Sequence, residues 1–414
     1  MRTATGLERR SITFRRTHHG PILAKRDGRP LAVRVGGLAE GGILGQFYAM
    51  ARARDLSEFR QALDLNALPN QHLVYADANG SILYVYNGLI PRRNPSFDWE
   101  APVDGSDPAT EWQGVHPLSE RPQFLDPPGG FVQACNSSPF LATSMAVLDP
   151  ASYPHYMVAA ADHDNARARR ARQLLGREEP FSFEDFGRLP TDSFLLEAGE
   201  RLPALFAAWR AVPVGDPLRQ RLEPAVAELE RWNLVADVDS VPATLFLEWF
   251  ERMYGPASRG GPAPDPLGTL AEVLGGLEVD WGTWRVPWGE VNRLQRVTRP
   301  ADGAVKPGYS DNGPSLPVAG ATSWAGTVNV FAGPRSDGNR RRYGVAGRAN
   351  TAVVEFGATV NARSIVPFGQ SMDPSSPHFL DQAPLYAAGE LKPMWFTRRE
   401  LEGHIERSYH PGAE

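Results

Sequence analysis

Two β-type runs joined through an Asn-Gly dipeptide place the strongest constraint on how this chain folds. The runs cover residues 74–77 and 81–86, and Asn79-Gly80 lies between them. Asn and Gly accept the left-handed backbone that a tight hairpin turn requires. We therefore predict an antiparallel hairpin, with Asp77 accepting hydrogen bonds from the N–H groups of the turn.

The residues around this hairpin are also mostly β-type. A strand is expected at 31–35, and apolar residues at helical spacing predict a helix over 47–65. Residues 91–130 are rich in Pro, Gly and Asp and are expected to form ordered loop.

The pattern becomes helical from about residue 163 to 280. A helix is expected at 165–175, and Ser182 carries the signal of a helix N-cap. The Gly/Pro-rich stretch 255–266 is predicted to be a mobile loop. After residue 281 the pattern returns to short β runs such as 327–331 and 352–356.

Strands that flank a block of helices are typical of an α+β fold. We expect three parts: a β-rich part at 1–150, a helical segment at 151–280, and a β- and loop-rich part at 281–414 that closes the same fold.

Residues 130–140 contain the strongest candidate for chemistry. They read GFVQACNSSPF, in which a short strand at 131–133 is expected to deliver Asn136 into a Ser-Ser-Pro turn. A carboxamide held in this way can donate its NH₂ group to a developing negative oxygen. The alternative is an Asn that only satisfies the backbone of its turn, and the motif alone favours that alternative.

Ordered segments along nearly the whole chain resemble the penicillin acylases, a family that includes acyl-homoserine-lactone and aculeacin-type acylases. The segments are THHGPI at 17–22, VYADANGSILYV at 74–85, GLIPRR at 88–93, VDGSDPATEWQG at 103–114, the Asn136 turn, and PFGQS with DPSSPH at 367–378. The resemblance implies an αββα sandwich of the N-terminal-nucleophile hydrolases, of which this chain holds a part.

The resemblance also implies roles for two residues. Asn136 would donate to the oxyanion, and Arg167 would position both Asn136 and the amine of the nucleophile. From spacing alone, Arg167 belongs to a solvated helix face that it shares with Arg169 and Arg170.

The family's nucleophile is a Ser at a freed N-terminus, and we expect it, together with the small chain of the same precursor, to lie outside this sequence. The chain alone is then expected to be inactive. The resemblance implies N-acyl amide substrates, a periplasmic or extracellular location, and no cofactor. A structural calcium is compatible with it, with ligands mostly outside this chain. A non-catalytic binding or scaffold relic of the same fold is the alternative.

Other sequence features exclude several competing classes. The formal charge of −5 and the pI near 6.0 show none of the excess positive charge that is typical of nucleic-acid-binding proteins. No apolar run reaches the length of a membrane span. The single Cys135 excludes an internal disulfide, and we interpret it as a small buried apolar side chain rather than a nucleophile.

Overall fold

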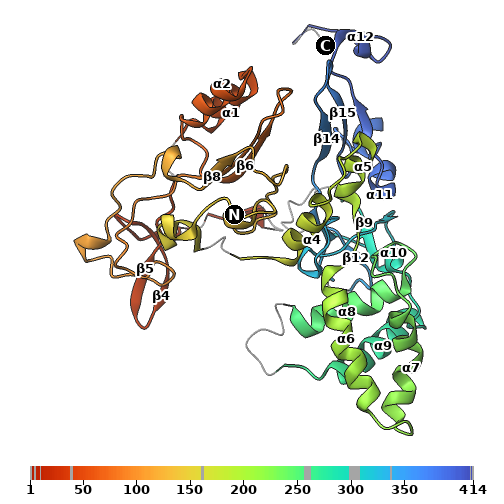
Figure 1. The fold of residues 1–414 in the computed structure, drawn as a ribbon. Helices are drawn as coiled ribbons and strands as arrows, with labels where there is room; N and C mark the ends of the chain where they lie inside the picture. Colours follow the sequence, from red (N-terminus) through yellow and green to blue (C-terminus); the bar gives the residue numbers. More distant parts are fainter. Residues whose placement is uncertain are drawn as a thin grey trace. The chain divides into compact units, whose positions relative to one another are not determined.

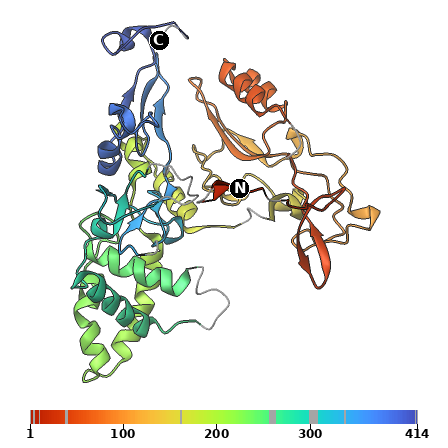
Figure 2. The ribbon, with the colours of Figure 1, turned by 180° about the vertical axis from the view of Figure 1, so that it is seen from behind.

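The computed structural model forms two compact units, Met1–Gly176 and Arg177–Glu414 (Figures 1 and 2). It describes residues 2–3, 6–9, 11–37, 41–159, 163–255, 263–297, 308–335, 338–410 and 412. The three parts expected from the sequence, divided at residues 150 and 280, are parts of one fold and differ in kind from these two compact units. That division therefore stays a prediction. Each unit is described by itself.

A three-stranded antiparallel sheet organises the first unit. Strand β6 (Asn70–Ala76) pairs with β7 (Ile82–Gly88), which also pairs with β8 (Gln123–Leu125). The predicted hairpin is confirmed, with Ala76 opposite Ile82.

The turn of this hairpin spans residues 77–81, between the end of β6 and the start of β7. Only Gly80 has a positive φ, +87°, while Asn79 does not. The reason lies in Asp77, whose Oδ1 accepts from the N–H groups of Asn79 at 2.9 Å and Ser81 at 3.1 Å. This Asp-capped turn with Gly in the left-handed region replaces the tighter alternative.

Two short helices cover the sheet where one was expected. They are α1 (Ile43–Arg52) and α2 (Leu56–Leu63). The chain is extended at Ala53, and Asp55 then starts α2 as an N-cap that accepts from the N–H of Glu58. Phe59 and Leu63 of α2 pack with Leu83 and Val85 of β7.

The remaining elements of the first unit are short. Its other strands are β1 (Arg2–Thr3), β2 (Gly6–Leu7), β3 (Arg16–Thr17), β4 (Gly20–Arg26) and β5 (Arg29–Ala32). The strand expected at 31–35 thus ends at Ala32. The unit closes with α3 (His155–Val158) and α4 (Ala166–Leu175), and α4 confirms the predicted helix.

Helices form the main core of the second unit (Figures 1 and 2). They are α5 (Phe183–Arg188), α6 (Leu196–Ala211), α7 (Pro217–Glu230), α8 (Val241–Tyr254) and α9 (Pro266–Trp281). Ser182 caps α5 as predicted. Helix α8 is the most buried, and Phe246 and Trp249 lie inside the core that it shares with α6, α7 and α9. Of the expected loop at 255–266, residues 256–262 lie outside the described residues.

Short strands and helices complete the second unit. They are α10 (Trp288–Val291), β9 (Asn292–Leu294), β10 (Leu316–Pro317), β11 (Phe331–Ala332), β12 (Arg342–Tyr343), β13 (Ala346–Gly347), β14 (Thr351–Glu355), β15 (Asn361–Ile365), α11 (Ala383–Ala388), β16 (Lys392–Met394) and α12 (Arg398–Leu401).

The two expected β runs of this region have different outcomes. The run at 352–356 is confirmed as β14, which pairs with β15. The run at 327–331 is wrong at residues 327–329, because Thr327 and Asn329 bond to the carbonyl of Asp192 instead of a neighbouring strand. Its last two residues do pair, Val330 in an isolated bridge with Ala321 and Phe331 in β11.

The described part of the chain mixes helices with sheets of two or three strands, which agrees with an α+β class. The αββα sandwich stays a prediction. None of the helices in the described residues is long and apolar enough to cross a membrane.

Candidate oxyanion site

Asn136 lies in a loop of the first unit, and the strand expected before it is wrong. Residues 131–133 form no strand, because the N–H of Gln133 bonds to the carbonyl of Ala142 within the same loop, at 2.8 Å. The Gln133 side chain also accepts from the N–H of Cys135, at 2.9 Å. These two bonds replace strand pairing and fold the segment back on itself.

The backbone of Asn136 adopts the left-handed region, with φ of 54°. Asn enters this region more readily than other non-glycine residues, since its short polar side chain bonds locally. The side chain of Asn136 is exposed in the structure. The loop therefore presents the carboxamide outward.

Arg167 fixes the orientation of that carboxamide. Its Nη2 donates to Oδ1 of Asn136 at 2.6 Å and to the carbonyl of Cys135 at 2.8 Å. A guanidinium only donates, so the oxygen end of the carboxamide must face Arg167. The Nδ2 group then points away from Arg167 with its two N–H donors, and no hydrogen bond within the described residues uses them. The structure thus brings the two predicted site residues together.

Asn165 is a site residue that the sequence analysis missed. It is the N-cap of α4, where its Oδ1 accepts from the N–H of Ala168 at 2.9 Å. Its Nδ2 donates to the carbonyls of Cys135 at 3.0 Å and Asn136 at 3.3 Å. One side chain therefore starts the helix that carries Arg167 and holds the loop that carries Asn136. The available signal was an Asn directly before an Ala/Arg-rich helical segment.

The electrostatic environment of the site is positive. No carboxylate in the described residues pairs with Arg167, whereas the nearby Arg172 is bonded to Asp164. Asn165 and Arg167 also belong to the N-terminal turn of α4, where the helix dipole favours negative charge. The arrangement suits an anion or an oxygen that becomes negative.

Cys135 does not have the character of a nucleophile. Burial raises the pKa of its thiol above the ordinary value, and the opposing effect of Arg167 and Arg172 is smaller. The thiolate is the reactive form of Cys, so this shift lowers its reactivity. Cys135 was predicted to be a small buried apolar side chain rather than a nucleophile; it is only partly buried, and the raised pKa of its thiol agrees with the second part of that prediction.

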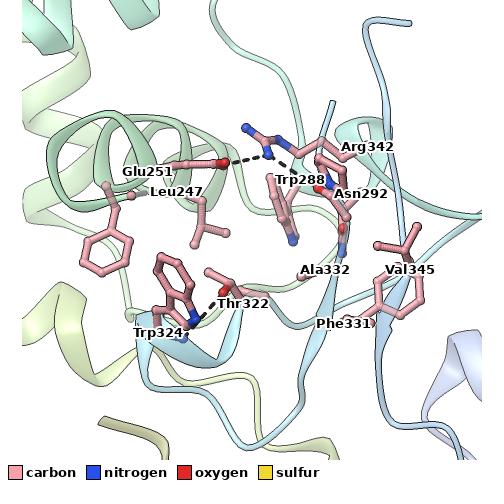
Figure 3. A pocket seen from close by; sticks show the side chains of 16 residues that line it. Leu247, Glu251, Trp288, Asn292, Thr322, Trp324, Phe331, Ala332, Arg342 and Val345 are labelled. Carbon is pink, nitrogen blue, oxygen red and sulfur yellow. Dashed lines mark hydrogen bonds and ion pairs between the residues drawn. The ribbon is translucent and has the colours of Figure 1, made fainter. Parts of the chain in front are cut away.

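The second unit contains a separate apolar cavity of about 340 Å³ (Figure 3). Leu247, Trp288, Trp324, Phe331 and Val345 contribute its apolar surface.

An ion-pair network lies at one side of this cavity. Arg342 bonds Glu251 through Nη1 at 2.7 Å (Figure 3). Its Nε bonds the buried Glu248 at 2.9 Å. Such a cavity admits an apolar group and offers the half-exposed Glu251 as its charged edge.

The family resemblance is compatible with a structural calcium, but the described residues contain no oxygen-rich group of ligands for it. The group of metal-ligating side chains found there is His18, His19 and Glu111, which has two nitrogen ligands and one carboxylate. Calcium prefers six to eight oxygen ligands. The calcium therefore stays a prediction that rests on residues elsewhere.

Comparisons with known proteins agree with the fold and the order of the motifs. Residues 1–403 match the penicillin amidase family. An acyl-homoserine lactone acylase of Pseudomonas syringae pv. syringae is 25% identical over 406 residues, which are 90% of this chain and 51% of that protein. The penicillin acylase 2 proenzyme of Pseudomonas sp. strain SE83 is 26% identical over 425 residues, covering 92% and 51%.

A solved structure shares the fold. It is a thermostable penicillin G acylase from Alcaligenes faecalis, with a TM-score of 0.61 at 18% identity, covering 100% of this chain and 80% of that chain. The chain belongs to the penicillin amidase family. It spans about half the length of the two relatives, 51% of each.

Proposed function

We propose that this chain supplies the oxyanion donor of an acylase that hydrolyses N-acyl amides. The observation that carries the proposal is the bond from Arg167 to Oδ1 of Asn136, which leaves the two Nδ2 donors directed away from Arg167 and unused within the described residues. Membership in a family whose relatives are named acylases supports the same activity.

The chemistry at Asn136 follows from the charge that develops during amide hydrolysis. A nucleophile adds to the carbonyl carbon, the C=O π electrons move to oxygen, and the oxygen becomes negative. Nδ2–H of Asn136 donates to this oxygen. The positive charge of Arg167 at Oδ1 polarises the amide of Asn136, which makes its N–H groups stronger hydrogen-bond donors. Collapse of the intermediate restores the carbonyl and expels the amine, and water then releases the acyl group as a carboxylate.

The nucleophile in the resembled enzymes is a Ser at a freed N-terminus, whose own α-amino group takes the proton. The reference pKa of an α-amine, ~7.7–8.0, leaves it partly neutral at neutral pH and suits this task. We assign the role of nucleophile to no residue of this chain. The proposal includes a second chain of the same precursor as partner, and an exported location. Its substrates are acyl-homoserine lactones, lipopeptides and β-lactam side-chain amides.

A panel of these three amide classes tests the function, with an acyl anilide as the chromogenic member. A preparation of the enzyme that contains this chain is expected to release equal amounts of carboxylate and amine from at least one class. The relic alternative predicts a different result, in which an acyl amide binds to the protein but is recovered intact. Binding without any product in the whole panel would therefore reject the proposed function.

A further inference from the structure

Three potential metal ligands converge at the surface of the first unit, away from the chemistry assigned to Asn136. His18 and His19 form the turn between β3 and β4, and Glu111 directly follows a short 3-10 turn, Pro108–Thr110. Nε2 of His18 lies 2.6 Å from Oε1 of Glu111, and Nδ1 of His19 lies 3.8 Å from the same oxygen. All three ligand atoms lie within 4.8 Å of one another.

The tautomer of His19 is set by its other nitrogen. Nε2 of His19 lies 2.8 Å from the carbonyl oxygen of Gly105. A carbonyl only accepts, so Nε2 carries the hydrogen, and Nδ1 of the neutral ring presents a lone pair. Two electron-rich atoms, Nδ1 of His19 and Oε1 of Glu111, thus face each other across 3.8 Å. A cation between them would turn this unfavourable contact into an attraction.

The same arrangement is typical of histidines that bind metals. A metal-ligating His usually donates its second N–H to a backbone carbonyl or a carboxylate, which fixes the ring. Gly105 provides that carbonyl for His19. Zinc bonds of ~2.0–2.2 Å to N and O in a tetrahedral site place neighbouring ligand atoms ~3.3 Å apart. The 2.6 and 3.8 Å separations lie on either side of this spacing.

The site is open on one side and has a positive neighbour on another. The side chain of His18 is 66% exposed and that of Glu111 is 42% exposed, which leaves room for a water ligand. Arg34 bonds Oε2 of Glu111 at 2.9 Å and stacks on Trp112. Arg34 therefore orients the carboxylate through its second oxygen and leaves Oε1 toward the histidines.

We propose that His18, His19 and Glu111 form a binding site for a divalent first-row transition metal ion, with Zn²⁺ as the favoured occupant. Two imidazoles and one carboxylate suit this class, whereas Ca²⁺ and Mg²⁺ prefer oxygen ligands alone. The ion replaces the proton that His18 shares with Glu111. It links the turn between β3 and β4 to the loop that ends at Glu111, so its first expected effect is on stability rather than on turnover.

Zn²⁺ and Co²⁺ alone are the probes. Tag-free chain, stripped with a chelator, is titrated with Zn²⁺ in a calorimeter and with Co²⁺ in a spectrophotometer. We expect one ion per chain, visible d–d absorption of Co²⁺ in a low-symmetry N/O site, and a higher melting temperature in excess Zn²⁺.

Variants locate the ion. His18→Ala and Glu111→Gln each remove a ligand. Each is therefore expected to weaken Zn²⁺ binding by more than the ~10–100-fold that is typical when a residue hydrogen-bonded to a ligand is replaced. His19→Ala is expected to do the same. His378→Ala is the matched control, since it removes an exposed His that contacts the carboxylate of Asp381 but no second His. It is expected to bind Zn²⁺ with unchanged affinity.

Two results would overturn the site. One is the absence of stoichiometric Zn²⁺ or Co²⁺ binding by the folded wild-type chain. The other is wild-type affinity in both His18→Ala and Glu111→Gln, which would place the ion elsewhere. Circular dichroism of each variant without metal separates lost binding from lost folding, and the exposed His18 is the substitution that disturbs the fold least.

Discussion

Arg167 donates a 2.6 Å hydrogen bond to Oδ1 of Asn136 across 31 positions of sequence. This contact holds the oxygen end of the carboxamide toward Arg167 and leaves its Nδ2 donors directed away from Arg167. It also gives the site a cation that no carboxylate in the described part of the chain neutralises. We therefore expect the two residues to act as one donor unit.

Substitution of Arg167 tests that unit. Arg167→Ala leaves Asn136 free to rotate and is expected to lower kcat by up to the ~10²–10³ that loss of one oxyanion donor costs. The double variant with Asn136→Ala is expected to lose little more than either single variant, because both remove the same interaction. Arg172 lies on the same helix and pairs with Asp164, so Arg172→Ala removes a positive charge from that helix and serves as the control. Fully additive losses in the double variant would contradict a shared role.

Asn165 has two functions that a pair of variants separates. Asn165→Ala removes the helix cap and is expected to destabilise the chain by about 0.5–2 kcal/mol. Asn165→Asp keeps the capping oxygen but cannot donate to the carbonyls of Cys135 and Asn136. We expect near-normal stability of α4 with reduced kcat for Asn165→Asp, measured by denaturant unfolding and by turnover. Equal stability losses in both variants would show that capping is not the main contribution.

Cys135 is expected to react slowly with alkylating reagents. Its pKa is raised by burial, so at any pH below that pKa the thiolate fraction is smaller than in a free thiol. The alkylation rate of the native chain should therefore rise only at higher pH than the rate of the denatured chain. Cys135→Ala should leave turnover nearly unchanged. Fast alkylation near neutral pH would contradict the assigned environment.

The buried Glu248 in the second unit predicts a dependence of stability on pH. Burial is the largest single effect and acts to raise the pKa of Glu248, but Arg342, Arg335 and Arg252 together outweigh it and lower the pKa below its ordinary value. A lowered folded-state pKa means that the stabilisation is present above the ordinary Glu pKa of ~4.3 and is lost as pH falls below it.

Glu248→Gln removes the buried partner of Arg342, which keeps only the half-exposed Glu251, and is expected to cost up to about 3–5 kcal/mol of unfolding free energy near neutral pH. Glu251→Gln alters the half-exposed partner of the same Arg342 and is expected to cost about 0–1 kcal/mol. Chemical denaturation of both variants at neutral and acidic pH checks this. A cost of Glu248→Gln that stays constant down to acid pH would contradict the ion-pair origin.

Local patterns were sufficient where neighbouring residues decide the structure. The hairpin at Asn79-Gly80, the N-cap at Ser182 and the helix at 166–175 depend on residues a few positions apart. Asp77 was also correctly expected to accept turn N–H bonds. Of the Asn79-Gly80 pair, however, only Gly80 lies in the left-handed backbone region.

Long-range bonds decide what the patterns could not show. Residues 131–133 have β-type side chains, but Gln133 bonds to Ala142 and holds the segment as loop. The choice of Arg167 over its Arg neighbours required the family resemblance, since spacing alone placed them on one solvated face. The second role of Asn165 was not visible, because it depends on two carbonyls about thirty positions earlier.

Asn136→Gly is the measurement that tests the central claim most directly. Gly accepts the left-handed backbone that Asn136 adopts, so this variant removes the carboxamide without the backbone strain that Ala would add. We predict that kcat of the active enzyme falls by ~10²–10³ while KM and the melting temperature change little. Maturation of the chains is followed on a gel, so that turnover is counted per mature enzyme. A variant that melts early yet turns over normally would contradict the account, because Asn136 would then serve only its turn.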